Sequence, residues 1–354
     1  MIELNNEQRK IVEAKENKVL VASCAGSGKT RCLIARFQYL IENGVSPEKI
    51  VMITFTNAAA EEIMERLDRP KGTFIGTIHS YANYLLLSRS LETADILENE
   101  QFDKLFERVK KSPECVKEVE HLLLDEGQDS TEIQFEFMLD IIKPKNWMIF
   151  ADWRQSVYRW NGAYPEQIIE LSHDKSVTVY QLSGNYRNGS NILAFAKNII
   201  MAAGYDYRDS SIPMRDIGGK VIPDIEYSPV AIARTIKQYG NYGEWFVLTR
   251  TNAQLDEIAY FLTKEGVPND TFKRSELDNK QLAEKMSQNT VKVLTIHTSK
   301  GLEANNVIVI GAKFFNTEER CVSYVAATRA RNQLVWTRMP NKKRAASMTS
   351  NWER

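Results

Sequence analysis

One short segment limits the fold of this chain more than any other. Residues 19–30 join an apolar β-type run to a loop of small residues and then to Gly-Lys-Thr, and a helical pattern follows over residues 30–43. This order predicts a phosphate-binding loop, in which Gly26 and Gly28 let backbone N–H groups face a phosphate at a helix N-terminus. Ser23 stands where the strict pattern of such loops has glycine. Because the loop connects a buried strand to a helix, it predicts an α/β fold.

The alternation of strand and helix continues along both halves of the chain. Short β-type runs bounded by turn residues lie between segments of helical periodicity, a pattern that favours parallel sheets covered by helices. The predicted strands are residues 19–23, 50–56, 121–124, 147–151, 178–182, 245–249, 291–296, 307–310 and 334–337. The predicted helices are residues 30–43, 58–67, 191–202, 253–265 and 322–330.

The length of 354 residues corresponds to about two domains. Tyr164-Pro165 and the polar run 172–175 interrupt the apolar pattern, so we expect a domain boundary there. Residues 81–120 are expected to be mostly helical with charged faces, whereas residues 204–243 lack a regular pattern. The expected parts are a first domain over residues 1–172, a second over 173–338, and a flexible basic tail over 339–354.

Charge balance, apolar runs and cysteine spacing limit the class of protein to which this chain can belong. The 46 Lys and Arg residues balance 46 Asp and Glu residues, so a nucleic acid would have to bind to a local basic face. The sequence has neither a secretory signal pattern nor an apolar run long enough to span a membrane, and we expect a cytoplasmic protein. The cysteines are too scattered for a zinc site and are expected to be free thiols; they are Cys24, Cys32, Cys115 and Cys321.

An acidic pair follows the predicted strand 121–124. Lys29 of the loop can reach the β- and γ-phosphates of a nucleotide, and Thr30 and Asp125 can hold Mg²⁺. Glu126 can then orient and deprotonate the attacking water. Taken singly, the loop could be a glycine-rich turn with a chance lysine, and the acidic pair a solvated strand end. Together they predict nucleotide hydrolysis, a chemistry that kinases, GTPases, ABC ATPases and motors share.

Further strings distinguish among these classes. The acidic pair begins an Asp-Glu-x-Gln-Asp string over residues 125–129, and Asp-Trp-Arg-Gln-Ser-Val-Tyr-Arg-Trp-Asn-Gly-Ala follows over residues 152–163. These strings, and their order along the chain, resemble those of the UvrD/Rep family of superfamily 1 DNA helicases. Other matching strings occur at residues 4–8, 54–62, 76–80, 185–187, 248–254, 295–303 and 324–330.

The resemblance implies two RecA-like P-loop NTPase domains with parallel sheets, with ATP and Mg²⁺ in a cleft between them. Gln8 corresponds to the residue that reads the adenine edge, and Arg36 and Tyr186 to residues that sandwich the adenine ring. Arg187 and Arg329 correspond to arginines that reach the γ-phosphate from the second domain. Gln155 and Glu303 correspond to sensors of the γ-phosphate and the ribose. The loop contacts are Ala25, Gly26, Ser27, Gly28, Lys29, Thr30 and Arg31.

The resemblance also implies a path for single-stranded DNA. Phe55, Tyr158 and Trp160 would be platforms on which bases stack. For Phe55 and Tyr158 the alternative is a core position at a strand end, and for His79 and His297 it is a structural histidine. For the arginines of the nucleotide site the alternative is a surface ion pair, and for Tyr186 it is a buried core position. The expected contacts to the DNA backbone are Asn57, His79, Arg250, Asn252 and His297.

The chain also departs from the family pattern. Asn161 stands where the family usually has arginine, which removes a cation beside the DNA. The large helical insertions of the family are reduced over residues 81–124 and essentially missing over residues 255–290. In the family the second insertion contacts duplex DNA and restrains or licenses unwinding, so its loss bears on strand separation and leaves translocation intact. We expect a monomeric ATP-dependent helicase or translocase that moves 3′ to 5′ on single-stranded and tailed duplex DNA. The alternatives are a DNA-stimulated ATPase that regulates a nuclease or a repair or defence complex, and an RNA motor.

Overall fold

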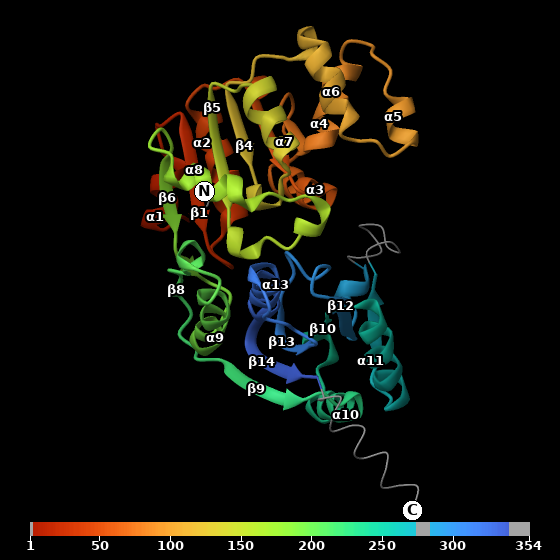
Figure 1. The fold of residues 1–354 in the computed structure, drawn as a ribbon. Coiled ribbons are helices and arrows are strands. Elements are labelled where there is room, and N and C mark those ends of the chain that lie inside the picture. Colours follow the sequence, from red (N-terminus) through yellow and green to blue (C-terminus); the bar gives the residue numbers. More distant parts are fainter. Residues whose placement is uncertain (1–2, 274–283, 340–354) are drawn as a thin grey trace, which may run out of the picture. The chain divides into compact units, whose positions relative to one another are not determined.

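The computed structural model describes residues 3–273 and 284–339 (Figure 1). The chain divides into two compact units, Met1–Gly184 and Asn185–Arg354. The expected boundary at residues 172 and 173 therefore falls inside the first unit. The reason is that the strand over residues 178–182 pairs with the strand before the phosphate loop. The expected tail lies, except for Met339, outside the described residues.

The first unit contains a sheet of six parallel strands in the order β3-β2-β4-β5-β1-β6. Its strands are β1 Lys18–Ser23, β2 Ile50–Thr54, β3 Phe74–Thr77, β4 His121–Leu124, β5 Asn146–Ala151 and β6 Thr178–Leu182. Strand β5 lies between β1 and β4, with Ala22 opposite Ala151 and Leu124 opposite Ile149. Because the strands are parallel, the segments after all three lie at one edge of the sheet.

Strand residues alternate between two hydrophobic clusters, one on each face of this sheet. Leu20 belongs to one cluster, with side chains of the helices α4 Ile78–Leu87 and α6 Lys104–Lys111. Val19 and Val21 belong to the other, with side chains of α2 Lys29–Glu42. This two-residue period is that of strands buried on both faces. The helices of the first unit are α1 Asn6–Val12, α2 Lys29–Glu42, α3 Asn57–Arg66, α4 Ile78–Leu87, α5 Ala94–Glu98, α6 Lys104–Lys111, α7 Glu132–Glu136 and α8 Pro165–His173.

The region over residues 81–120 is largely helical, as expected, and Figure 1 shows α4, α5 and α6 together at one end of the first unit. Several details of this unit differ from the prediction, among them the helices α1, α7 and α8, which were not predicted. The predicted strand 50–56 ends at Thr54, because the side chain of Thr56 accepts a hydrogen bond from the backbone of Ala59 and begins α3. Strand β3 was not predicted from the sequence.

The second unit also has a sheet of six parallel strands, in the order β11-β12-β10-β13-β14-β9. Its strands are β9 Lys220–Glu226, β10 Trp245–Thr249, β11 Asn269–Phe272, β12 Val291–Thr295, β13 Ala304–Ile310 and β14 Ala330–Arg338. The short strands β7 Gly184–Asn185 and β8 Ile212–Pro213 form a separate pair. Its helices are α9 Ser190–Met201, α10 Pro229–Tyr239, α11 Asn252–Lys264 and α13 Thr317–Ala327.

The prediction that residues 204–243 are irregular was wrong, because they contain β9 and α10. The predicted helix 322–330 ends earlier, at Ala327, since Ala330 already begins β14. In the part of the chain that the structure describes, no helix is long and apolar enough to cross a membrane. The cysteines Cys24, Cys32, Cys115 and Cys321 are buried free thiols, and burial raises the pKa of Cys32 to about 12.

Candidate functional site

The phosphate loop connects β1 to α2 in the first unit. Gly26 and Gly28 have φ angles of +63° and +83°, a left-handed conformation that glycine adopts without strain. Helix α2 begins directly after Gly28, which provides no side-chain cap, so its first N–H groups can point to a ligand. The buried hydroxyl of Ser27 has no hydrogen-bond partner among the described residues. This conformation fits a bound phosphate group.

The acidic pair lies beside the loop. Lys29 Nζ is 3.3 Å from Glu126 Oε1, and Asp125 is buried. Glu126 has a φ angle of +53°, and its backbone N–H donates to Asp125 Oδ1 over 2.9 Å. A left-handed residue other than glycine costs about 1–3 kcal/mol and is often found at functional sites. The structure thus brings the predicted phosphate ligand and the predicted general base together.

A chain of buried and partly buried hydrogen bonds connects the acidic pair to Gln155. The amide of Gln128 donates to Glu126 Oε2 through Nε2 and accepts from the backbone N–H of Asp152 at 2.9 Å through Oε1. Asp152 Oδ2 in turn accepts from Gln155 Nε2 at 2.6 Å. Sequence reasoning did not assign a role to Gln128 or Asp152, although both lie within the quoted strings. Their position between the predicted base and the predicted sensor becomes visible only in the structure.

The predicted adenine contacts lie in different units. Gln8 is buried, and its Nε2 donates to the Ser27 carbonyl at 3.3 Å. Arg36 Nη1 donates to the carbonyls of Val12 and Ala14 at 2.7 and 2.8 Å, and burial lowers the pKa of Arg36. Tyr186, in the second unit, is 41% exposed. Their contact with adenine stays a prediction.

Two of the predicted nucleotide residues of the second unit, Arg187 and Glu303, are in direct contact. Arg187 Nε donates to Glu303 Oε2 at 2.5 Å, and Arg331 bonds the other carboxylate oxygen. Burial alone would raise the pKa of Glu303, but the charges and hydrogen bonds of the two arginines outweigh it and hold the pKa below its ordinary value.

Arg329 has a different environment. Its side chain is buried, with Nε 3.0 Å from the carbonyl of Val325 and Nη1 3.1 Å from that of Leu302. The guanidinium is therefore bonded to the backbone of its own unit in this structure. A contact of Arg187 or Arg329 with the γ-phosphate stays a prediction.

Three aromatic rings predicted to contact DNA adjoin one another in the first unit; we call Phe55, Tyr158 and Trp160 the aromatic ridge. The rings of Phe55 and Tyr158 are stacked with centroids 4.8 Å apart, and the Trp160 ring meets Tyr158 edge-on at 6.4 Å. Trp160 is 64% exposed, whereas Tyr158 is buried. Of the three, Trp160 therefore offers the largest surface for a base to stack on.

The predicted backbone contacts of the first unit follow neighbouring strands. Asn57 is the first residue of α3, after β2, and His79 follows β3. His79 Nε2 lies 3.2 Å from Asp103 Oδ1, and its ring stacks on Phe106 with centroids 5.0 Å apart. His79 thus has the contacts of a structural histidine, and its contact with DNA stays a prediction.

The predicted contacts of the second unit follow β10 and β12, which pair with Thr249 opposite Thr295. Arg250, Asn252 and His297 therefore come from the same edge of the sheet. Arg250 forms two hydrogen bonds with Glu319, at 2.6 and 3.1 Å. It also lines a groove of about 900 Å³ whose aromatic members are Phe195, Phe314, Phe315 and Trp336.

Two family models match the chain. The model described as the UvrD/REP helicase N-terminal domain matches residues 4–112 and 96–176, and that of the UvrD-like helicase C-terminal domain matches residues 269–340. The chain belongs to the UvrD/REP helicase family. Its two units, each with a parallel six-stranded sheet, are the RecA-like domains of this family.

Curated relatives carry helicase names. ATP-dependent DNA helicase PcrA of Staphylococcus epidermidis is 24% identical over an alignment 367 residues long. The alignment covers 75% of this chain and 50% of the relative. A probable DNA helicase of Mycoplasma pneumoniae is 26% identical over 452 residues, 94% of this chain and 83% of the relative. DNA helicase II of Haemophilus influenzae is 26% identical over 291 residues, which cover 56% of this chain and 40% of the relative. The chain spans about half the length of the PcrA relatives.

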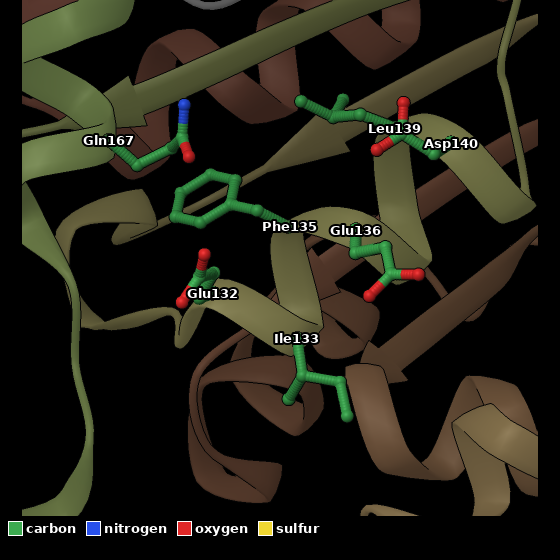
Figure 2. A pocket seen from close by; sticks show the side chains of 7 residues that line it. All are labelled: Glu132, Ile133, Phe135, Glu136, Leu139, Asp140 and Gln167. Atoms are coloured by element: carbon green, nitrogen blue, oxygen red, sulfur yellow. The ribbon is translucent and has the colours of Figure 1, made fainter.

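This UvrD/REP family member has a further groove of about 590 Å³ in its first unit, shown in Figure 2. It is lined by α7, by the π-helical turn Phe137–Ile141 and by Gln167 of α8. Glu132, Glu136 and Asp140 follow one another at four-residue spacing along it. None of the residues predicted for nucleotide or DNA lines this groove.

Proposed function

We propose that this chain is an ATP-dependent motor that moves 3′ to 5′ on single-stranded DNA and unwinds tailed duplexes. The observation that carries the proposal is the continuous arrangement at one sheet edge of the first unit. There an ion pair joins the phosphate loop to Glu126, and hydrogen bonds through Gln128 and Asp152 join Glu126 to Gln155. Tyr158 of the aromatic ridge follows three residues after Gln155 and stacks on Phe55. The helicase names of the relatives favour a motor over a regulatory subunit. We propose that it acts in the cytoplasm as a monomer.

The proposed hydrolysis uses residues of both units. The loop N–H groups bind the phosphates of ATP, and Lys29 moves from Glu126 to the β- and γ-phosphates. Thr30 and Asp125 would hold Mg²⁺, which neutralises phosphate charge when bound. Glu126 accepts the proton of the attacking water, and Gln155 contacts the γ-phosphate. Arg187 and Arg329 supply positive charge to the transition state.

The proposed DNA contacts combine stacking with contacts to the DNA backbone. The aromatic ridge gives bases a surface that does not depend on sequence. Asn57 and His79 in the first unit, and Arg250 and Asn252 in the second, bind the backbone of the same strand. Because the chain as a whole carries no net charge, this local set has to supply the affinity.

The test is steady-state ATP hydrolysis by the whole chain with and without single-stranded DNA. We expect strong stimulation by DNA that declines across a salt series, because contacts with phosphates release counterions. A duplex with a 3′ single-stranded tail should then be unwound, and one with a 5′ tail should not. Hydrolysis that is indifferent to DNA would overturn the motor, and unwinding from the 5′ tail would overturn the direction alone.

Replacing Trp160 by alanine should weaken binding of single-stranded DNA by roughly 5- to 150-fold, the effect of losing about 1–3 kcal/mol of base stacking. The measurement is fluorescence anisotropy of a labelled oligonucleotide at fixed salt. Tyr84→Ala is the matched control, because Tyr84 is also an exposed aromatic residue of the first unit but lies outside the ridge. Equal losses in both variants would show that the ridge has no special role.

A further inference from the structure

The phosphate loop is part of a closed ring of buried or partly buried contacts within the first unit. Lys29, at the end of the loop, pairs with Glu126, and Gln128 connects Glu126 to Asp152. Arg154 connects Asp152 back to Ser23, at the start of the loop. We call this set the loop ring; its members are Ser23, Lys29, Glu126, Gln128, Asp152 and Arg154.

Arg154 closes the ring with one planar side chain. Its Nε donates to Asp152 Oδ1 at 2.6 Å, and its Nη2 donates to the backbone carbonyl of Ser23. The side chains of Arg154 and Asp152 are 6% and 0% exposed, so each buried charge faces an opposite charge. A guanidinium fixes the two acceptors at a set spacing, which an ammonium group cannot do.

Ser23 forms a second hydrogen bond, through its side chain. Its hydroxyl donates to the carbonyl of Ala151 at 2.8 Å. This bond explains the serine at a position where the strict loop pattern has glycine, because a glycine would lack the hydroxyl. The start of the loop is thus bonded to the end of β5 both through Ser23 itself and through Arg154.

The same carboxylate that holds Arg154 also holds Gln155. Asp152 Oδ1 accepts from Arg154, and Asp152 Oδ2 accepts from Gln155 at 2.6 Å. A displacement of the Gln155 amide therefore acts on Asp152, and through Arg154 on the backbone at the start of the loop. One carboxylate thus connects Gln155 to Arg154, and Arg154 to the start of the loop.

We propose that Arg154 is a positioning residue that holds Gln155 in register with the phosphate loop, so that the site distinguishes ATP from ADP. The inference rests on the proposed ATP-dependent function. Arg154 does not itself contact the nucleotide in this proposal. It acts through Asp152 and Ser23, and its loss affects the interaction that only a γ-phosphate can make.

The test is the affinity of the full chain for two fluorescent nucleotides, ADP and a non-hydrolysable ATP analogue, in the presence of Mg²⁺. Arg154→Lys keeps a positive charge opposite Asp152 but replaces the rigid fork that spans Asp152 and Ser23 by a single ammonium group. We expect the Kd for the ATP analogue to rise about tenfold, the effect of losing one hydrogen bond to a charged group. The Kd for ADP should stay near the wild-type value, because ADP has no γ-phosphate.

Arg108→Lys is the matched control. The Arg108 guanidinium also bonds a carboxylate, Asp95, and a backbone carbonyl, that of Glu92, but it lies outside the loop ring. Both affinities should be unchanged in this variant. If Arg154→Lys does not fold, the double variant Asp152→Asn/Arg154→Gln removes both buried charges together and should show the same selective loss.

Two results would overturn the inference while leaving the proposed function intact. Equal losses of affinity for both nucleotides would mean that Arg154 supports the loop in general, and unchanged affinities would mean that the ring has no effect on binding. A wild-type chain that binds neither nucleotide would overturn the proposed function and the inference together.

Discussion

Replacing Glu126 by glutamine should lower the kcat of DNA-stimulated ATP hydrolysis about 10²- to 10⁴-fold, the usual contribution of a general base. Glutamine keeps the size of the side chain and leaves the glycines and Lys29 of the loop in place, so the nucleotide should still bind. The measurement is steady-state hydrolysis at saturating single-stranded DNA, together with nucleotide binding followed by fluorescence.

Glu132→Gln is the control for this experiment. Glu132 lies in the same unit, but it lines the groove of Figure 2 and not the phosphate loop. Its variant should hydrolyse ATP at the wild-type rate. Retention of full activity by Glu126→Gln would contradict the assignment of Glu126 as the general base. A loss of nucleotide binding as large as the loss of kcat would mean that Glu126 supports the loop and not the chemistry.

Replacing Arg187 by alanine should lower kcat about 10³- to 10⁵-fold, the range found when an arginine that stabilises a transferring phosphoryl group is removed. The KM for ATP should change much less, because this charge acts mainly in the transition state. The measurement is the pair of kinetic constants from ATP titrations at saturating DNA.

Arg331→Ala separates this role from a structural one. Arg331 bonds the same carboxylate of Glu303 as Arg187 does, but it is not among the residues assigned to the nucleotide. If Arg187 serves only to pair with Glu303, the two variants should lose activity to a similar extent. A large loss confined to Arg187→Ala would support a direct action on the γ-phosphate.

Local sequence patterns predicted much of this fold. The phosphate loop, its two flanking elements and most buried strands were correct, because each depends on a short run of residues. Strand β9 was missed, since most of its residues are exposed at the sheet edge and it contains Pro223. Strand β6 was predicted but placed in the wrong domain, because its pairing with β1 joins residues that are far apart in the sequence.

The sequence predicted the candidate nucleotide site about as completely as it predicted the fold. Lys29, Asp125 and Glu126 follow from residue types at the ends of strands. The role inferred for Arg154 could not be predicted from the sequence. Its partner Ser23 lies 131 positions away, and the bond is to a backbone carbonyl, which no side-chain pattern reveals. For the same reason the bonds of Arg36 and Arg329 to carbonyls of their own units were not foreseen.

The burial of every cysteine has a practical consequence for measuring motion. A buried thiol reacts slowly with maleimide dyes, so the four native cysteines offer them no accessible target. One new surface cysteine in each unit would then carry a donor and an acceptor fluorophore without removal of the native residues. Energy transfer between the dyes would follow the distance between the units as nucleotide and DNA are added.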